Sequence, residues 1–394
     1  MAIRLYAQLL RKPQIQIAVI AAFVSGLMVG LPLAVVLMVQ RETGSFASAG
    51  AVSAAVAIAA AVLGPLRGRA VDRRGQGILP GFAILSALAL VALVLATESE
   101  APLGALIVLG AMAGAATAPV LPSLRNLWID LVDDARQLPA AYGLHAVLLE
   151  AFFIGGPLIA GGLIAVGSPA FAVLALAACE LVGVVSFALM PASRGWRGAP
   201  SNAGRAGALA SAGVVTLVLI DVPYGAMFGA LDVAVPAFAT ARGAAAAAGP
   251  ILAALALGSM IGGLAFGARA AGPGDRGRRN LVLLATVTLL IAPAMFAESL
   301  AALGVIMAVA GLAVAPLTAL FFGLIDDIAP VGTATEAASW ITTAYTAGFA
   351  LGTAGGGVVV DHLGTTEAFA AAAAFALVAT AICAVRRRSL PAAA

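Results

Sequence analysis

Charged residues are scarce in this sequence. Of its 394 residues, only 10% are charged and 62% are hydrophobic, whereas an average soluble domain carries about 25% charged residues. An ordinary soluble globular fold is therefore excluded, because it would have too little polar surface to face water. The solvent that suits this composition is lipid, in which a spanning helix needs about 20 mostly apolar residues.

Side chains that commonly carry catalysis or bind metals are also scarce. The chain has two cysteines and two histidines, and its single lysine is Lys12. Cys179 and Cys383 lie in apolar segments, and neither His145 nor His362 has a partner at metal-ligand spacing, so we expect no disulfide framework and no metal site. The motifs Gly-x-Ser-x-Gly, His-Glu-x-x-His and the Walker loop are absent. A membrane-embedded enzyme is the weakest hypothesis, and we expect neither enzymatic activity nor a cofactor.

Long segments with little or no charge predict twelve transmembrane helices. Residues 137–193 contain only two acids and have a Gly-Ser-Pro turn near their middle, so they predict two helices. Residues 206–241 contain two aspartates and predict one helix. The uncharged segments, each predicting one further helix, are 13–40, 43–66, 75–97, 101–124, 243–268, 280–297, 299–325, 337–360 and 368–385.

The basic residues predict the orientation of these helices. With twelve spans, 19 of the 21 lysines and arginines fall on the side that carries both termini, and only Arg41 and Arg242 fall on the other. Cytoplasmic loops of membrane proteins are enriched in basic residues. We therefore expect a multi-pass protein of the cell (inner) membrane with both termini in the cytoplasm. The net charge of +3 reflects this bias and indicates no nucleic-acid partner.

The chain divides into two halves of six predicted helices. Residues 191–210 are rich in Pro, Gly, Ser and Arg and predict a cytoplasmic linker between bundles formed by 1–190 and 211–394. Similar patterns recur at an offset near 200 residues, which indicates duplication, with chance similarity in an Ala/Gly-rich chain as the alternative. Two like halves are one architecture of secondary transporters, in which the substrate site lies between the halves near the midplane.

Four acids lie within the predicted helices, where a charge costs about 2.5–3.5 kcal/mol at the bilayer centre. They are Glu150, Glu180, Asp221 and Asp232, and no basic residue lies within a predicted span to pair with them. A carboxyl group in such a place can take up and release a proton. We predict that these acids are proton-coupling candidates, Glu150 first. The alternative is that they bond neighbouring helices or reach the interface.

Aromatic residues accompany the acids. In segment 206–241, helical spacing places Asp221, Phe228 and Asp232 on one face, with Tyr224 beside it. We predict that this face lines a cavity, with ordinary helix packing as the alternative. The candidates for substrate contact are Tyr224, Phe228, Trp340 and Tyr345.

Small residues mark two helices for close packing. Gly156, Pro157 and Gly161 lie in segment 137–193, and Gly348 and Gly352 form a Gly-x-x-x-Gly motif in segment 337–360. Such a motif lets helix backbones approach closely, and an internal proline removes one backbone hydrogen bond and can kink its helix. We predict packing or hinge positions in both helices.

The loop after segment 43–66 contains Gly68-x-x-x-Asp72-Arg73-x-Gly75. This pattern resembles the signature between helices 2 and 3 of the major facilitator superfamily. The resemblance implies an all-α fold of two pseudo-symmetric six-helix bundles. It also implies that this loop latches the cytoplasmic side, with the aspartate against the start of the eleventh helix and the arginine near acids of a neighbouring loop.

Two further residues belong to the predicted latch. Thr333 and Glu336 have the spacing of a capping box at the start of the eleventh helix. The positive end of that helix favours an anion, so the resemblance places Asp72 there. For Arg73, the acids Asp130, Asp133 and Asp134 are the candidate partners.

The run Gly156-Pro157-x-x-x-Gly161 is similar to the antiporter signature of the drug-efflux branches. It departs by one residue of spacing, and Phe152 stands where that pattern has glycine. Segment 108–116 also lacks the arginine that those branches usually carry in helix 4. The resemblance implies a secondary transporter that exports compounds in exchange for protons, as in multidrug resistance. The sparse polar groups within the predicted spans favour small, fairly apolar compounds over sugars as substrates. We expect the protein to be monomeric. An importer or facilitator of a metabolite is the alternative.

Overall fold

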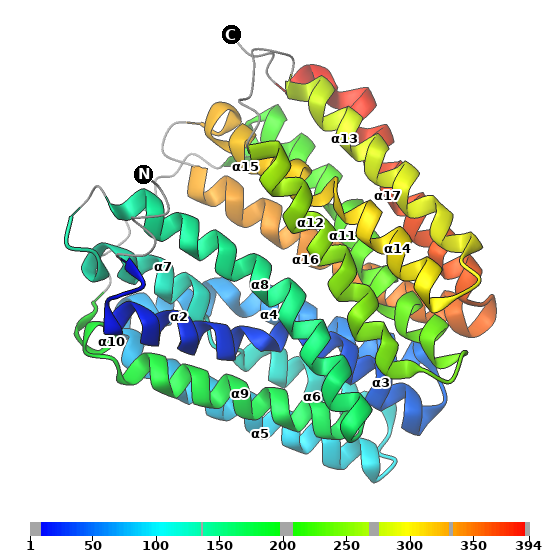
Figure 1. Cartoon of the computed structure of the whole chain (residues 1–394), viewed down its shortest axis with the longest axis horizontal. Coiled ribbons are helices and arrows are strands. Elements are labelled where there is room, and N and C mark those ends of the chain that lie inside the picture. Colours follow the sequence, from blue (N-terminus) through cyan, green and yellow to red (C-terminus); the bar gives the residue numbers. More distant parts are fainter. Residues whose placement is uncertain (1–8, 135–136, 198–207, 268–275, 331–333, 391–394) are drawn as a thin grey trace.

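The computed structural model describes residues 9–134, 137–197, 208–267, 276–330 and 334–390. All regular structure within these ranges is helical. Figure 1 shows the helices of the first half of the chain in one bundle and those of the second half in a second bundle beside it. Most of the predicted linker, residues 198–207, lies outside the described residues.

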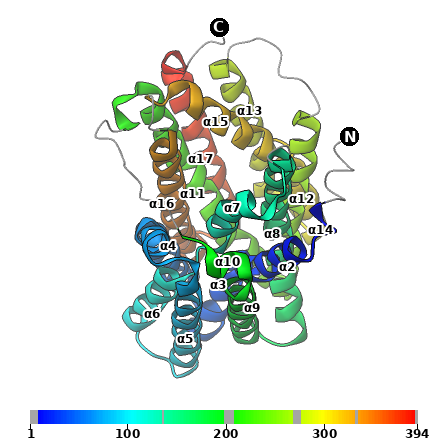
Figure 2. The same cartoon turned by 90° about the vertical axis from the view of Figure 1, so that its left-hand side faces the viewer.

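The first bundle begins with a span of three pieces. They are α2 (Pro13–Gly26), the 3-10 helix η1 (Leu27–Gly30) and α3 (Leu31–Thr43). The rest of the bundle consists of α4 (Phe46–Arg74), α5 (Leu79–Glu98), α6 (Leu103–Ala116), α7 (Val120–Leu131), α8 (Leu138–Val166) and α9 (Pro169–Leu189), followed by the short α10 (Pro191–Gly195). Figure 2 shows α10 at the end of the bundle, next to α7 and α9.

The second bundle repeats this plan. It consists of α11 (Ala212–Thr240), α12 (Ala248–Gly267), α13 (Arg276–Ile291), α14 (Leu300–Gly311), α15 (Val314–Ile328), α16 (Ala334–His362) and α17 (Thr365–Arg386). The fourth span is divided between α6 and α7, and the tenth is divided between α14 and α15. A break at the same place in each bundle is what two copies of one six-helix unit would have.

Twelve spans follow from these helices. Eleven described segments are long and apolar enough to cross a membrane. The remaining span is α16, which has 29 residues but is less apolar because it is rich in glycine and threonine. Its small residues lie against neighbouring helices.

Of these eleven segments α11 is the most buried, and it packs against α16 and α17. The contact with α16 is made by backbones: a Cβ at Gly225 would collide with the Tyr345 carbonyl oxygen, and a Cβ at Gly348 would collide with the Val222 carbonyl oxygen. Gly352 approaches the Ala226 carbonyl in the same way. Small residues are a common means of such close approach in membranes, where lipid gives apolar side chains no reason to prefer one another.

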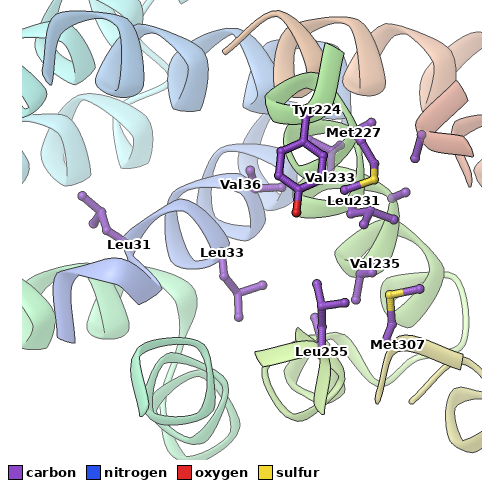
Figure 3. Close-up of a cluster of buried hydrophobic side chains, with 14 of the residues drawn as sticks. Leu31, Leu33, Val36, Tyr224, Met227, Leu231, Val233, Val235, Leu255 and Met307 are labelled. Atoms are coloured by element: carbon purple, nitrogen blue, oxygen red, sulfur yellow. The ribbon is translucent and has the colours of Figure 1, made fainter. Parts of the chain in front are cut away.

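A continuous apolar core joins the two bundles. Figure 3 shows Leu33 and Val36 of α3 facing the region of Leu231 and Val235 of α11 and Leu255 of α12. The labelled side chains are largely withdrawn from solvent. The first and seventh spans, which occupy equivalent places in the two bundles, therefore lie at the centre of the molecule.

The backbone contact between α11 and α16 predicts a position-specific cost for one methyl group. Gly352→Ala places a Cβ onto the Ala226 backbone, and overpacking of this kind costs about 1–3 kcal/mol. Gly355→Ala is the matched control, because nothing lies within 4 Å of a Cβ there. Thermal unfolding of the purified protein should show a lower melting temperature for Gly352→Ala alone. Equal melting temperatures for the two variants would show that the contact is not tight.

Candidate functional site

Four aromatic rings form a cluster between three helices of the second bundle. Tyr224 and Phe228 belong to α11, Phe321 to α15 and Tyr345 to α16. The ring centroid of Tyr224 lies 5.2 Å from that of Phe228, 6.2 Å from that of Phe321 and 6.3 Å from that of Tyr345. The predicted contact residue Trp340 does not join the cluster, because its side chain is exposed farther along α16.

Two acids of α11 flank this cluster. Asp221 is buried, and the charges of Asp221 and Asp232 both act on the Tyr345 hydroxyl. The Oδ2 atom of Asp232 is shielded from solvent and has no hydrogen-bond partner among the described residues. Two carboxyl groups beside aromatic rings, with no ion-pair partner among the described residues, make a place that suits a proton or a positively charged group.

The face predicted on α11 is largely buried by helix packing. Gly225, which lies on that face between Asp221 and Phe228, is in backbone contact with Tyr345. Phe228 is half-buried, whereas Tyr224 is buried. Helix packing, the alternative to a cavity, therefore occupies the middle of the face at Gly225. Asp221 and Asp232 lie on either side of this contact.

Glu180 is held by the first bundle. This residue of α9 is 2% exposed, and its carboxylate accepts hydrogen bonds from the Ser86 hydroxyl at 2.7 Å and from the Ala118 amide at 3.1 Å. Ser86 lies in α5, and Ala118 lies in the break between α6 and α7. The Glu180 side chain thus joins three spans. This agrees with the alternative hypothesis that the acid bonds neighbouring helices.

Arg67 holds the other side of the same break. Its guanidinium donates to the carbonyl oxygens of Gly114 at 2.7 Å, Ala115 at 3.1 Å and Ala60 at 2.6 Å. The carbonyl groups at the end of α6 are therefore bound by the guanidinium of Arg67. The Ala118 amide, which precedes α7, is bound by the carboxylate of Glu180. Backbone groups freed by a helix break need such partners, because lipid offers none.

Sequence reasoning missed this role of Arg67. The residue follows the uncharged segment 43–66 and was grouped with the loop charges, but α4 continues to Arg74. The side chain is consequently buried inside the bundle, where its charge also acts on Glu180. Among the described residues, Glu180 is therefore the one acid of the four on which the charge of a basic side chain acts.

Glu150 differs from Glu180 in its bonding within the described part of the structure. It lies half-buried in α8, and the described residues provide neither an ion-pair partner nor a hydrogen-bond partner for its carboxylate. The four acids thus fall into two groups. Glu180 is fixed by hydrogen bonds, whereas Glu150, Asp221 and Asp232 have no ion pair or side-chain hydrogen bond to another described residue.

Small residues of α8 lie against both bundles. A Cβ at Gly156 would come within 2.7 Å of the Gly30 nitrogen in the first span, and a Cβ at Gly161 would come within 3.0 Å of the Gly249 Cα in α12. Phe152 lies against Gly26, where a Cβ would collide with its ring. The phenylalanine that departs from the antiporter pattern is accommodated by a glycine on the facing helix.

The loop after α4 is anchored to its own bundle. Gly75 ends α4 with a positive φ of 82°, and the next residue, Gln76, is fully buried. The Gln76 side chain donates to the Ser123 carbonyl at 3.0 Å and accepts from the Ser193 hydroxyl at 2.9 Å. These bonds join the loop to α7 and α10, and sequence reasoning did not single out Gln76.

The predicted latch lies largely outside the described part of the structure. This applies to Thr333 and to the side chains of Asp72 and Glu336. Gly68 lies within α4, where a Cβ would meet nothing within 4 Å, and the Arg73 side chain is exposed. A candidate partner of Arg73, Asp133, forms an ion pair with Lys12 at 2.6 Å.

Comparison with known proteins identifies the family. A sequence profile described as the Major Facilitator Superfamily matches residues 18–273. The chain belongs to the major facilitator superfamily. The fold predicted from the loop around Asp72 is thereby confirmed. A search of curated proteins finds no match.

Solved transporters of the same architecture align over nearly the whole chain. A point mutant of the nucleoside transporter NupG has a TM-score of 0.75 at 12% identity and covers 96% of this chain and 100% of its own. A bacterial homologue of the iron transporter ferroportin, in an inward-facing state, has a TM-score of 0.69 at 16% identity, covering 98% and 99%. A bacterial homologue of the human lysosomal transporter Spinster has a TM-score of 0.70 at 15% identity, covering 96% and 98%.

The clamp on the fourth span makes Arg67 important for stability. Removing its guanidinium in Arg67→Ala leaves buried carbonyls without a donor, and hydrogen bonds to charged groups contribute about 1.5–3 kcal/mol each. Arg69→Ala is the control, because Arg69 lies in the same helix with an exposed side chain. Thermal unfolding in detergent should show a large decrease in melting temperature for Arg67→Ala and almost none for Arg69→Ala. A small decrease for both variants would show that the helix break does not depend on the guanidinium of Arg67.

Proposed function

We propose that this transporter exports small, fairly apolar compounds in exchange for protons by alternating access. The observation that carries the proposal is the pair of carboxyl groups, Asp221 and Asp232, beside the aromatic cluster of α11, α15 and α16. A carboxyl group without a fixed cation can bind either a proton or a substrate. Competition between the two couples the movement of one to that of the other.

The proposed orientation places the termini in the cytoplasm. It is supported by the distribution of lysine and arginine, of which 19 of 21 lie on the terminus side of the twelve spans. In a cell membrane, protons would then enter from the opposite side, here termed the far side. Substrate would leave toward the same side.

The substrate class follows from the side chains of the site. Four aromatic rings offer apolar and π surface, and the nearby charged groups are acids. Such a site favours neutral or cationic compounds with an apolar body over anions, because an anion would meet two carboxyl groups. The structurally similar transporters are named for nucleosides and iron, so the fold supports several substrates and this proposal rests on the chain's own residues.

The acids receive different roles in this scheme. Asp221 and Asp232 form the site at which proton and substrate compete. Glu150, half-buried and without a partner among the described residues, is a second place for the coupled proton. Glu180 acts through the position of the fourth span, since its carboxylate bonds Ser86 and Ala118.

Reconstituted vesicles with an acidic interior test the proposal. A panel of fluorescent apolar dyes should accumulate inside, because outward proton flow drives the dye inward through an exchanger, and an uncoupler should abolish the accumulation. Asp221→Asn should lower gradient-driven accumulation by about tenfold, which corresponds to about 1.4 kcal/mol. Glu98→Gln, an exposed acid at the end of α5, is the control and should behave as the wild type.

The alternative functions give different results in the same vesicles. A facilitator would equilibrate the dye at the same rate with and without the gradient. An importer that carries protons and substrate together would accumulate its compound only under an acidic exterior. Either result, or an unchanged rate for Asp221→Asn, would contradict the exchange of protons at this site.

A further inference from the structure

On the far side of the molecule, one carboxylate connects the two bundles. Asp361 lies in the last turn of α16, in the second bundle, and its partners begin α4 in the first. The carboxylate accepts hydrogen bonds from the Ser45 hydroxyl at 2.6 Å, from the Phe46 amide at 2.8 Å and from the Ala47 amide at 2.8 Å. Both carboxylate oxygens are used.

The start of α4 is suited to an anion. The first amides of a helix have no partner within the helix, and the helix dipole makes this end positive. Ser45 is the N-cap residue, and its hydroxyl accepts from the Ser48 amide at 3.1 Å while it donates to Asp361. Asp361 therefore completes the cap with amides that the serine leaves free, and charged hydrogen bonds are stronger than neutral ones.

The same two helices are in backbone contact over several turns. A Cβ at Gly357 of α16 would collide with the Phe46 carbonyl oxygen, and a Cβ at Gly50 of α4 would collide with the Thr353 carbonyl oxygen. Both positions lie toward the far-side ends of their helices. The hydrogen bonds of Asp361 therefore close an interface whose geometry is already set by glycine.

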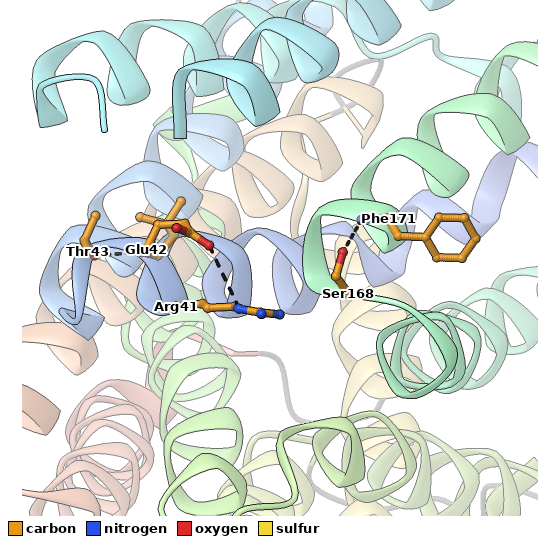
Figure 4. Close-up of polar contacts among 6 residues, drawn as sticks. Arg41, Glu42, Thr43, Ser168 and Phe171 are labelled. Atoms are coloured by element: carbon orange, nitrogen blue, oxygen red, sulfur yellow. Dashed lines mark hydrogen bonds and ion pairs between the residues drawn. The ribbon is translucent and has the colours of Figure 1, made fainter. Parts of the chain in front are cut away.

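Other charged or titratable residues on this side of the molecule, in the described part of the chain, include those at the ends of α3, α16 and α17. Arg41 and Glu42, at the end of α3, face one another at 4.0 Å, as Figure 4 shows. His362 is the titratable neighbour whose charge acts on Asp361, and Glu367 lies in the first turn of α17. From Phe46 onward, α4 has no charged residue before Arg67.

We propose that Asp361 is a far-side latch, which holds α4 and α16 together while this side is closed and must leave the α4 amides before it opens. The latch rests on the alternating access of the proposed function, but it does not depend on proton coupling. Asp361 is a positioning residue, because it contacts neither the substrate nor the proton site. It changes the ratio of far-side-closed to far-side-open molecules.

The latch is distinct from a proton switch. Asp361 lies beyond the uncharged part of its span. Burial raises the pKa of its carboxyl, but the hydrogen bonds from Ser45, Ala47 and Phe46, together with the charge of His362, lower it more. The net pKa lies below the ordinary value of about 3.9. Because the contact stabilises the ionised form, it is complete above that value and is lost only as pH falls through the lowered pKa. Between about pH 5 and 8 the latch should therefore not respond to protons.

Distances between spin labels test the latch directly. Labels at Ser99 of the first bundle and Leu363 of the second, both exposed on the far side, report its opening in a protein whose Cys179 and Cys383 are replaced. Asp361→Asn should increase the open-to-closed ratio by about tenfold or more in reconstituted protein, because the neutral amide loses the charge attraction. The open-to-closed ratio of Asp361→Glu should lie between that of the wild type and that of Asp361→Asn.

The controls separate a latch from general damage. Glu42→Gln changes another exposed far-side acid and should leave the distances unchanged, and Ser45→Ala should have a smaller effect than Asp361→Asn because both amides remain. The wild-type distribution should be the same at pH 5 and pH 8. Wild-type distances in well-folded Asp361→Asn would overturn the proposal, as would equal shifts for Glu42→Gln. Neither result depends on whether transport is coupled to protons.

Discussion

Close contact between helix backbones is the constraint on which the rest of this structure depends. Lipid surrounds the spans and gives leucine or valine no preference for another helix over the bilayer, so specific association requires close geometric fit. Two helices, α16 and α8, fit both bundles in this way. The first meets α11 at Gly348 and Gly352 and α4 at Gly357, and the second meets the first span at Gly156 and α12 at Gly161. A change in the angle between the bundles must therefore be accommodated at these two helices.

This constraint explains why polar groups lie where they do. Backbone contact on one side of α11 leaves Asp221 and the aromatic rings at the edges of that contact, beside α15 and α16. In the first bundle, the break in the fourth span exposes backbone groups that Arg67 and Glu180 bind from opposite sides. In the described part of the protein, Arg67 and Glu180 thus support a helix break, whereas Asp221 and Asp232 have no ion-pair partner.

The fold followed from the sequence to a large extent because lipid imposes a simple rule on helix length. Uncharged segments located the spans, and the loop around Asp72 indicated the superfamily. Segment 337–360 formed a helix although its glycines and threonines make it less apolar than the others. The breaks in the fourth and tenth spans were not predicted, because they depend on partners that are distant in the sequence, such as Ser86 and Arg67.

The candidate site was predicted less completely. Helical spacing placed Asp221 and Phe228 together, but it could not show that Gly225 between them would lie against Tyr345, which is 120 residues away in the sequence. The sequence did not indicate a role for Asp361, because this residue directly follows an uncharged segment and precedes the helix end at His362. Its role depends on amides in the other bundle, and a single sequence carries no sign of that contact.

The central claim is that proton and substrate compete for the acids of α11, and it is tested most directly by binding. A fluorescent apolar dye is titrated into the purified protein at several pH values, and the protons released on binding are measured in weakly buffered solution. The account predicts proton release together with a dye affinity that falls as pH falls, and both effects should be lost in Asp221→Asn. Dye affinity that is independent of pH, with no proton released, would contradict it.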